Sequence, residues 1–360
     1  MTKIGILTFH KAHNYGAVLQ AYALRKYLIQ EGCDTNIVDY LSDVNRKSNL
    51  KCFFKRRNVI SLSINFVFKF RRVLRRHKKF NYFIETYLSP KDTIKNSLNF
   101  RNLDYDIYCI GSDQVWNRKI IGRNETVYWG NINQSKKFKL TTYAASLGNE
   151  ALNSEDINDV GVYLEKFDAI SIREKEASVS VSNIINKQVA HVFDPTFLLD
   201  ANSYEVIISK PIIKDDYILV YQIAVSNETI KLAESIANKL NSKVVYLDSD
   251  VNSLVPKKNT YDTVGPSEYL RLIKDAKCII TTSFHGTAFS IIYNRPFYLI
   301  NIDSHNSRPK SLLQSLGLAD RIIYNSDYVS YQNVDWEKVN DTLQKERQKS
   351  FEFLKRNLVG

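Results

Sequence analysis

Short β-rich runs alternate with helical patterns along the chain, and this alternation is the feature that most constrains its fold. Residues 3–9 form a β-rich run, residues 16–30 have the apolar spacing of a helix, and residues 35–40 are β-rich again. A strand, a helix and a second strand in this order form a βαβ unit, whose two strands are parallel. The first forty residues therefore predict a parallel sheet.

The alternation continues in two series, separated by a polar, proline-containing stretch at residues 210–216. Further β-rich runs lie at 106–110, 140–145, 168–172, 189–193, 216–225, 243–248, 277–283 and 296–301. Helical spacing lies at 155–167, 227–240, 267–275 and 286–293. We predict an α/β fold with an N-terminal domain at 1–205, a C-terminal domain at 216–333 and one long polar helix at 334–360.

The composition is that of a chain able to bury two sizeable cores. Its 360 residues are 44% hydrophobic and 12% aromatic, which excludes fibrous, low-complexity and disordered proteins. The four cysteines, at positions 33, 52, 109 and 278, form neither a CxxC pair nor a dense disulfide framework. A reducing cytoplasm is the simplest compartment for them. No run approaches the roughly 18 apolar residues of a membrane span, so we expect a cytoplasmic protein without one.

Positive charge is concentrated in one segment. The chain has 50 lysines and arginines against 38 acidic residues, a net charge of +12. Thirteen of these basic residues and no acidic one lie between positions 46 and 79, interleaved with phenylalanine and aliphatic residues. This pattern predicts a basic amphipathic insertion at 46–85, of which 46–79 attaches to an anionic membrane surface. A solvated helix and nucleic-acid binding are the alternatives, and we expect no nucleic acid because no recognised motif accompanies the charge.

The first candidate for chemistry is the loop after the first β-rich run. Residues 9–24 pass from the end of a strand into the start of a helix, where backbone N–H groups favour anions. His10 and His13 are three positions apart without a suitably spaced third ligand, so hydrogen bonds to a ligand or the loop are favoured over a metal site. Asn14 suits the helix N-cap, and an ordinary cap and turn is the alternative interpretation.

The second candidate is the stretch 109–117, in which a β-rich run breaks at Gly111. Asp113 follows the predicted strand, at the position where open α/β sheets bind ligands. Its carboxylate could take a proton from a sugar hydroxyl or only hold that hydroxyl, and Trp116 offers an apolar face to a sugar ring. The alternative is a capping aspartate beside a core tryptophan.

The third candidate, at 281–297, is again a strand, a turn and a helix. His285 falls at the turn, and histidine is the side chain best suited to exchange protons near neutral pH. Gly286 lets a ligand approach the backbone, and the following N–H groups suit phosphate or carboxylate. The alternative is a buried histidine that is satisfied by its neighbours.

Together these stretches resemble the polysaccharide pyruvyl transferase family. The resemblance rests on NYGAVLQAYAL at 14–24, GSDQVWN at 111–117, SIRE at 171–174, DPTFLL at 194–199, SFHGTAFSIIYNRPF at 283–297 and SRPKSLLQSLGL at 307–318. It covers most of the chain except the basic segment. It implies two Rossmann-like domains in a GT-B-like arrangement, with the acceptor on the N-terminal side and the donor on the C-terminal side. It also implies transfer of a pyruvyl group from phosphoenolpyruvate onto a sugar as a cyclic ketal.

For such a reaction we assign His285 as the general acid toward the enol and Asp113 as the base or orienting group for the acceptor hydroxyl. The expected donor-binding residues are Arg173, Arg308, Ser283, Gly286 and Thr287. Better-studied family members carry Arg-Leu-His where this chain reads Ser283, Phe284 and His285. The family arginine is therefore missing here, and Arg308 is the nearby cation that could replace it.

The acceptor is expected to be a sugar or a lipid-linked oligosaccharide at the inner face of the cytoplasmic membrane. The expected acceptor-binding residues are His10, His13, Asn14, Tyr15, Gln114 and Trp116. The chemistry needs cations, an acid and a base, so we expect phosphoenolpyruvate as a substrate and no metal or cofactor. A glycosyltransferase with a nucleotide-sugar donor is the main alternative, and a non-catalytic sugar-binding protein is the second.

Overall fold

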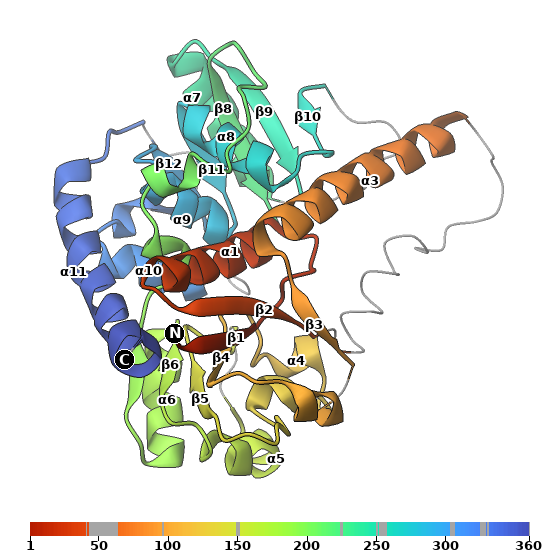
Figure 1. The fold of residues 1–360 in the computed structure, drawn as a ribbon. Coiled ribbons are helices and arrows are strands. Elements are labelled where there is room, and N and C mark those ends of the chain that lie inside the picture. The colour runs from red at the N-terminus through yellow and green to blue at the C-terminus, as the bar shows by residue number, and fades with distance from the viewer. Residues whose placement is uncertain are drawn as a thin grey trace. The chain divides into compact units, whose positions relative to one another are not determined.

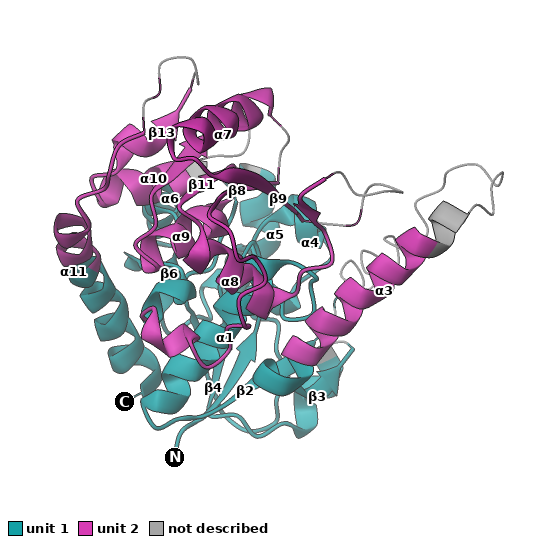
Figure 2. Cartoon of the chain, turned by 90° about the horizontal axis from the view of Figure 1, so that it is seen from above, with its two compact units in different colours: residues 1–56, 84–199, 344–360 teal, residues 57–83, 200–343 magenta. Residues whose placement is uncertain are grey.

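The computed structural model describes residues 1–40, 42, 64–95, 97–148, 152–223, 226–249, 251, 258–302, 307–324, 329 and 331–359 (Figure 1). The chain divides into two compact units. Unit 1 comprises residues 1–56, 84–199 and 344–360, and unit 2 comprises residues 57–83 and 200–343 (Figure 2).

Unit 1 is built on a parallel sheet of five strands in the order β3-β2-β1-β4-β5. The strands are β1 (Lys3–Leu7), β2 (Asp34–Tyr40), β3 (Lys91–Ile94), β4 (Ile107–Ile110) and β5 (Lys139–Thr142). A parallel pair, β6 (Ile170–Ile172) and β7 (Val189–His191), is joined to β5 by an isolated bridge between Thr141 and Ala169. The βαβ unit predicted for the first forty residues is confirmed, because β1 pairs in parallel with β2.

The helices of unit 1, except the last of the four, begin where a side-chain cap satisfies an N–H group of the first turn. They are α1 (Tyr15–Gln30), α4 (Arg118–Ile121), α5 (Ser154–Leu164) and α6 (Lys175–Ile185). The Asn14 side chain accepts from the backbone N–H of Ala17 and caps α1, as the sequence predicts. Asn153 and Asp156 form a reciprocal capping box at the start of α5.

Aromatic side chains make up much of the unit 1 core. The Tyr40 and Tyr128 rings pack edge to face with their centroids 5.4 Å apart, and the Tyr40 hydroxyl donates to Glu125 Oε2 at 2.7 Å. Phe100 packs against Tyr108 in the same geometry at 5.6 Å. Full burial of a large apolar side chain contributes about 1.5–3 kcal/mol, so these rings are a large part of the stability of the unit.

Unit 2 is built on a second parallel sheet, of six strands in the order β10-β9-β8-β11-β12-β13. The strands are β8 (Tyr217–Gln222), β9 (Lys243–Asp248), β10 (Thr260–Tyr261), β11 (Cys278–Thr281), β12 (Phe297–Ile300) and β13 (Ile322–Ile323). The helices are α3 (Ile64–Phe83), α7 (Asn227–Lys239), α8 (Pro266–Asp275), α9 (Phe284–Ile292) and α10 (Ser307–Ser315). The Phe289 ring packs edge to face against Tyr204 at a centroid distance of 5.2 Å and against Tyr269 at 5.9 Å.

The α/β class, the two parallel sheets and the long C-terminal helix are as predicted. Helix α11 (Trp336–Leu354) is followed by a π-helical turn at Lys355–Val359. The residue ranges of the two compact units nevertheless differ from those of the predicted domains. Residues 57–83, which include α3, belong to unit 2 and not to the N-terminal domain. Helix α11 is divided between the two units, with residues up to 343 in unit 2 and residues from 344 onwards in unit 1.

The predicted basic insertion is only partly described. Its first six basic residues, at positions 46–57, lie outside the described residues, whereas the other seven lie in α3. Across the described part of the chain, none of the helices is both long enough and apolar enough to cross a membrane.

Two glycines in unit 1 give a prediction about packing. Gly130 follows a 3₁₀ turn at Val127–Trp129 with φ +91°, and Gly32 has φ +87°. A Cβ at Gly130 would lie 2.5 Å from Leu140 Cδ2 in the core, whereas one at Gly32 would meet nothing within 4 Å. Both alanine variants bear the backbone strain, but only Gly130→Ala also overpacks the core. Gly130→Ala should therefore lose about 1–3 kcal/mol more unfolding free energy than Gly32→Ala in urea titrations. Equal losses would contradict this packing.

Candidate functional site

The candidate residues of unit 1 lie at the carboxyl edge of its sheet. The strand order reverses between β1 and β4, and open α/β sheets bind ligands where this reversal occurs. Residues 8–14 follow β1, and residues 111–114 follow β4. The first two sequence motifs are therefore brought together at the switch point of one sheet.

His10 is a structural residue. Its Nδ1 lies 3.1 Å from the Thr8 carbonyl oxygen, its Nε2 lies 3.0 Å from Asp39 Oδ1, and only 1% of the residue is exposed. Lys11 Nζ also donates to Asp39, at 2.7 Å. Burial alone would raise the pKa of Asp39, but the hydrogen bonds from His10 and Lys11 outweigh burial and lower it. The expected contact of His10 with an acceptor stays a prediction, and the two hydrogen bonds of its ring favour a structural role.

The rest of this loop is more accessible. His13 is half-buried and Asn14 is exposed, whereas Tyr15 is almost completely buried. Asn14 keeps its predicted position at the helix N-terminus while its side chain caps α1. His13 and Asn14 are thus the two residues of the predicted set that this loop presents at its surface.

Asp113 has the geometry of a functional position. It is half-buried, and its φ of +73° is in the left-handed region that non-glycine residues avoid. Its Oδ1 accepts from the backbone N–H of Gln114 at 2.9 Å, and Gln114 Oε1 accepts from Asn117 Nδ2 at 2.8 Å. Ala144, after the neighbouring strand β5, also has a positive φ, of +54°. Strained residues of this kind gather at functional sites, and nothing in the sequence marked Ala144.

Trp116 is a core residue. Its indole stacks on Trp129 with ring centroids 4.9 Å apart, Phe167 packs edge-on against it, and its Nε1 donates to the Tyr128 carbonyl at 2.8 Å. None of its surface is exposed. This burial favours the alternative of a core tryptophan over the expected contact of Trp116 with a sugar ring.

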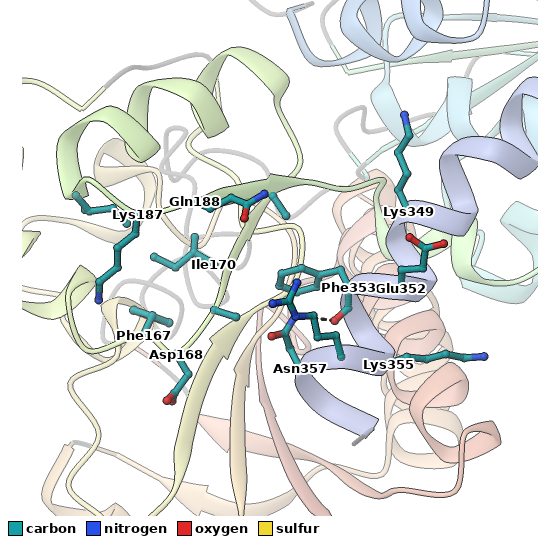
Figure 3. A pocket seen from close by; sticks show the side chains of 14 residues that line it. Phe167, Asp168, Ile170, Lys187, Gln188, Lys349, Glu352, Phe353, Lys355 and Asn357 are labelled. Atoms are coloured by element: carbon teal, nitrogen blue, oxygen red, sulfur yellow. Dashed lines mark hydrogen bonds between the residues drawn. The ribbon is translucent and has the colours of Figure 1, made fainter.

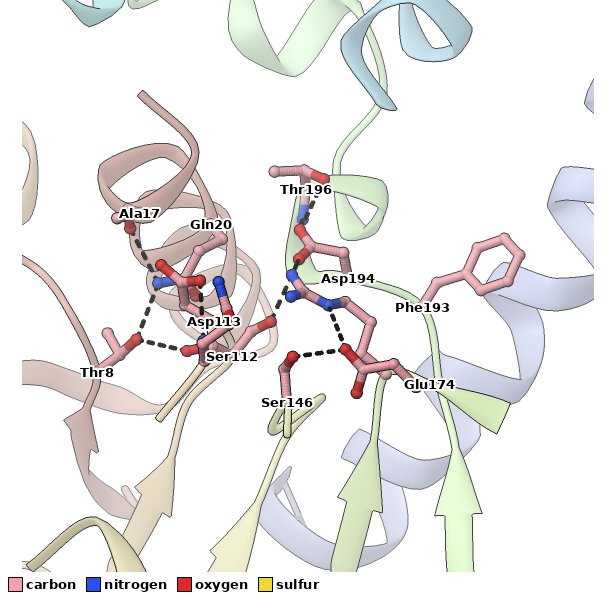
Figure 4. Close-up of polar contacts among 12 residues, drawn as sticks. Thr8, Ala17, Gln20, Ser112, Asp113, Ser146, Glu174, Phe193, Asp194 and Thr196 are labelled. Carbon is pink, nitrogen blue, oxygen red and sulfur yellow. Dashed lines mark hydrogen bonds and ion pairs between the residues drawn. The ribbon is translucent and has the colours of Figure 1, made fainter. Parts of the chain in front are cut away.

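Arg173 is buried in a polar network with Asp194 and Glu174, the two acidic residues labelled at the right of the network in Figure 4. Its Nη1 donates to Asp194 Oδ2 at 2.5 Å, and its Nε lies 3.7 Å from Glu174 Oε1. Burial alone would lower the pKa of Arg173, but the carboxylates of Asp194 and Glu174 outweigh burial and raise it. Two carboxylates already compensate the guanidinium charge, so this geometry favours a positioning role over the expected clamp on a donor anion.

The network connects four strand ends of unit 1. Ser112, after β4, donates to Asp194 Oδ2 at 3.2 Å, and Ser146, after β5, donates to Glu174 Oε1 at 2.5 Å. Asp194 also accepts from the backbone N–H and the hydroxyl of Thr196, at 3.0 and 2.8 Å. Except for Ser146, these residues stand in the GSDQVWN, SIRE and DPTFLL motifs. The motifs identified them in the sequence, but spacing alone did not pair Arg173 with Asp194.

The candidate residues of unit 2 also lie at a switch point, between β8 and β11. Ser283 follows β11 and caps α9 by accepting from the backbone N–H of Gly286 at 3.3 Å. His285 is the second residue of α9, is 8% exposed, and packs edge-on against Phe284 with ring centroids 5.1 Å apart. The structure therefore places His285 in the first turn of a helix at the ligand-binding edge of the sheet.

Close packing of α9 on the sheet gives a structural reason for a glycine at position 286. A Cβ there would lie 2.4 Å from Thr281 Oγ1 and 3.1 Å from Tyr221 Cδ1. The missing side chain thus lets α9 pack onto β11 and β8, while the expected approach of a ligand to Gly286 stays a prediction. Thr287 is fully buried, and its hydroxyl donates to the Ser283 carbonyl at 3.1 Å. Arg308 lies in the first turn of α10, but its side chain is outside the described residues.

Unit 1 has a cavity of about 800 Å³ (Figure 3). It is lined by Phe167, Asp168 and Ile170, at the amino end of β6, and by Glu352 and Phe353 of α11 among others. The amino ends of parallel strands are at the edge opposite the switch point. None of the residues expected at the site lines this cavity. Among the described residues, no cluster of three or more metal-ligating side chains is present.

Comparison with known proteins adds a family. Residues 14–304 match the model of the polysaccharide pyruvyl transferase family. A UDP-GlcNAc 2-epimerase from Methanocaldococcus jannaschii is similar in structure, with a TM-score of 0.48 and 12% identity over 99% of this chain and 100% of that one. Another UDP-N-acetylglucosamine 2-epimerase has a TM-score of 0.49 and 10% identity over 99% and 96%. No curated protein is significantly similar in sequence.

The buried pair predicts a large effect of one substitution. Asp194→Asn keeps the shape of the side chain but removes the main charge partner of Arg173, whose side chain is 3% exposed. Breaking a buried ion pair costs about 3–5 kcal/mol, because the remaining charge stays in the interior. Urea unfolding should show a loss of this size for Asp194→Asn. The control Asp104→Asn breaks exposed ion pairs to Lys3 and Lys136 and should lose far less. Equal losses would contradict the role of this network.

Proposed function

Because the chain belongs to the polysaccharide pyruvyl transferase family, we propose that it transfers the enolpyruvyl group of phosphoenolpyruvate to a sugar of a cell-surface polysaccharide precursor. The product is a cyclic ketal that bridges two sugar hydroxyls. The observation that carries this proposal is the family match over residues 14–304, which includes Asp113 and His285.

The reaction needs one proton donor and one proton acceptor. A proton added to the methylene carbon of phosphoenolpyruvate gives cationic character to the neighbouring carbon, and one sugar hydroxyl adds there as it loses its proton. Phosphate then leaves, and the second hydroxyl adds to the same carbon and loses its own proton. Of the two hydroxyl protons, one replaces the proton delivered to the methyl group and the other leaves with phosphate.

His285 is the proposed general acid. It stands in the first turn of α9 at a switch point, where a helix N-terminus favours the anionic donor. Asp113 is the proposed base or orienting group, because it presents a half-buried carboxylate at the carboxyl edge of the unit 1 sheet. Each assignment rests on the position of the residue within its own unit.

The proposed donor-binding and acceptor-binding residues are fewer than those expected from the sequence. Arg308 is the proposed cation for the donor, while Arg173 orders the strand ends through Asp194. On the acceptor side, the burial of His10, Tyr15 and Trp116 leaves the accessible members of the predicted set. These are His13, Asn14 and Gln114.

A glycosyltransferase with a nucleotide-sugar donor is the second candidate. The observation that favours it is Ser283, which caps α9 where better-studied family members have arginine. A helix N-terminus without that arginine suits the diphosphate of a nucleotide sugar as well as the phosphate of phosphoenolpyruvate.

Substitution of His285 tests the general acid. Such a group contributes roughly a hundred- to ten-thousand-fold in rate, so His285→Ala should lower phosphate release from phosphoenolpyruvate by that factor in the presence of a sugar acceptor. Thermal unfolding should show that the variant stays folded. His77→Ala, which removes a half-buried histidine of the same unit, should keep its turnover. Unchanged turnover in folded His285→Ala would refute the assignment.

Binding distinguishes the two donors. A ligand that binds the native state raises the melting temperature, so millimolar phosphoenolpyruvate should do so and a nucleotide sugar should not. Arg308→Met should weaken phosphoenolpyruvate binding roughly 10- to 100-fold, because a charged hydrogen bond is lost. Lys310→Met removes a cation from the same helix and should bind normally. A melting shift with a nucleotide sugar alone would favour the glycosyltransferase.

A further inference from the structure

Helix α3 has basic side chains on two faces, and these faces differ in their contacts with the rest of unit 2. Its twenty residues include no acidic residue and seven lysines and arginines, between positions 69 and 79. Residues three or four positions apart share one face of a helix. The contacts of these cations therefore show which face of α3 is used within unit 2.

The first face fixes α3 to unit 2. Arg76, 3% exposed, donates to the carbonyl oxygens of Ser249 at 2.8 Å and Val264 at 3.2 Å. Arg72 forms an ion pair with Asp262, and Lys79 Nζ lies 2.5 Å from Glu268 Oε1. The stem of Lys79 packs so closely on α8 that a Cβ at position 265 would lie 2.7 Å from Lys79 Cβ. These three cations are therefore part of the fold.

The second face is free of such contacts. We call it the exposed stripe, and it consists of Phe68, Arg71, Leu74, Arg75, Lys78 and Tyr82. Each member is three or four positions from another. Its large apolar and aromatic side chains are exposed to solvent, with Phe68 55% and Tyr82 64% exposed. Among the described residues, Arg71, Arg75 and Lys78 form no ion pair. A helix built only to pack on unit 2 has no need of this combination.

We infer that the exposed stripe docks the protein on an anionic lipid surface. Three uncompensated cations match the negative headgroups, and Phe68, Leu74 and Tyr82 provide the apolar and aromatic groups that enter the boundary of the acyl chains. Nucleic acid fits less well, because the aliphatic Leu74 side chain lies between the cations. The helix is not apolar enough to cross the bilayer, so the contact is interfacial.

This inference changes which residues to test. Substitution of Arg72 or Arg76 would disturb the packing of α3, because both contact the rest of unit 2. Arg71, Arg75 and Lys78 are exposed, so the triple variant Arg71→Gln, Arg75→Gln and Lys78→Gln should melt as the wild type does. A matched control changes three exposed lysines elsewhere in the same unit. These are Lys210, Lys239 and Lys338, each changed to Gln.

The test is sedimentation of the full chain with vesicles of phosphatidylcholine alone, or with added phosphatidylglycerol. We expect binding only to the anionic vesicles, with release at high salt. Each basic residue near such a surface contributes about 1 kcal/mol, so the triple variant should partition roughly a hundredfold less. The control should partition as the wild type does.

Three results would overturn the inference. They are equal partitioning of the triple variant and the control, equal binding to neutral vesicles, and preference for duplex DNA over anionic vesicles at equal phosphate concentration. The assay uses no donor and no acceptor, so it does not depend on the catalytic proposal. Only the further consequence, that the acceptor sugar is lipid-linked, rests on the proposed function. A protein that binds vesicles but not phosphoenolpyruvate would keep the docking surface and lose the pyruvyl transfer.

Discussion

Parallel pairing brings the carboxyl ends of the strands of a sheet to one edge, and each unit of this protein places its candidate chemistry there. In unit 1 the loops after β1 and β4 diverge at the reversal of strand order, and in unit 2 the loops after β8 and β11 do so. Asp113 and His285 occupy these positions. A chain that paired its strands in antiparallel order would scatter the same residues over two edges.

Regular features of the fold could be predicted from the sequence because they depend on neighbouring residues. The β-rich runs and helical spacing gave α1, α7 and α9 to within two residues, and Asn14 was recognised as a cap. The division into units was harder, because packing of α3 on α8 joins segments almost two hundred positions apart. Local patterns carry no information about such a contact.

The candidate site shows the same limit. Sequence motifs identify the strand ends but not which side chains face inward. The sequence therefore predicts ligand contacts for His10 and Trp116, whereas in the structure His10 hydrogen-bonds to Asp39 and Trp116 stacks on Trp129. Arg173 is the clearest case, because an arginine beside an anion site and an arginine paired with Asp194 read alike in a sequence. Burial separates them, since a buried charge needs a partner.

The central claim is that the chain forms a pyruvate ketal. It is tested most directly by incubating the protein with phosphoenolpyruvate labelled with ¹³C at the carbon that bears phosphate, together with a panel of sugar acceptors, and following the label by NMR. The account predicts that the label moves to a carbon bonded to two sugar oxygens, with one phosphate released for each ketal. A label that stays in phosphoenolpyruvate, while a sugar from a nucleotide-sugar donor appears on the acceptor, would contradict it.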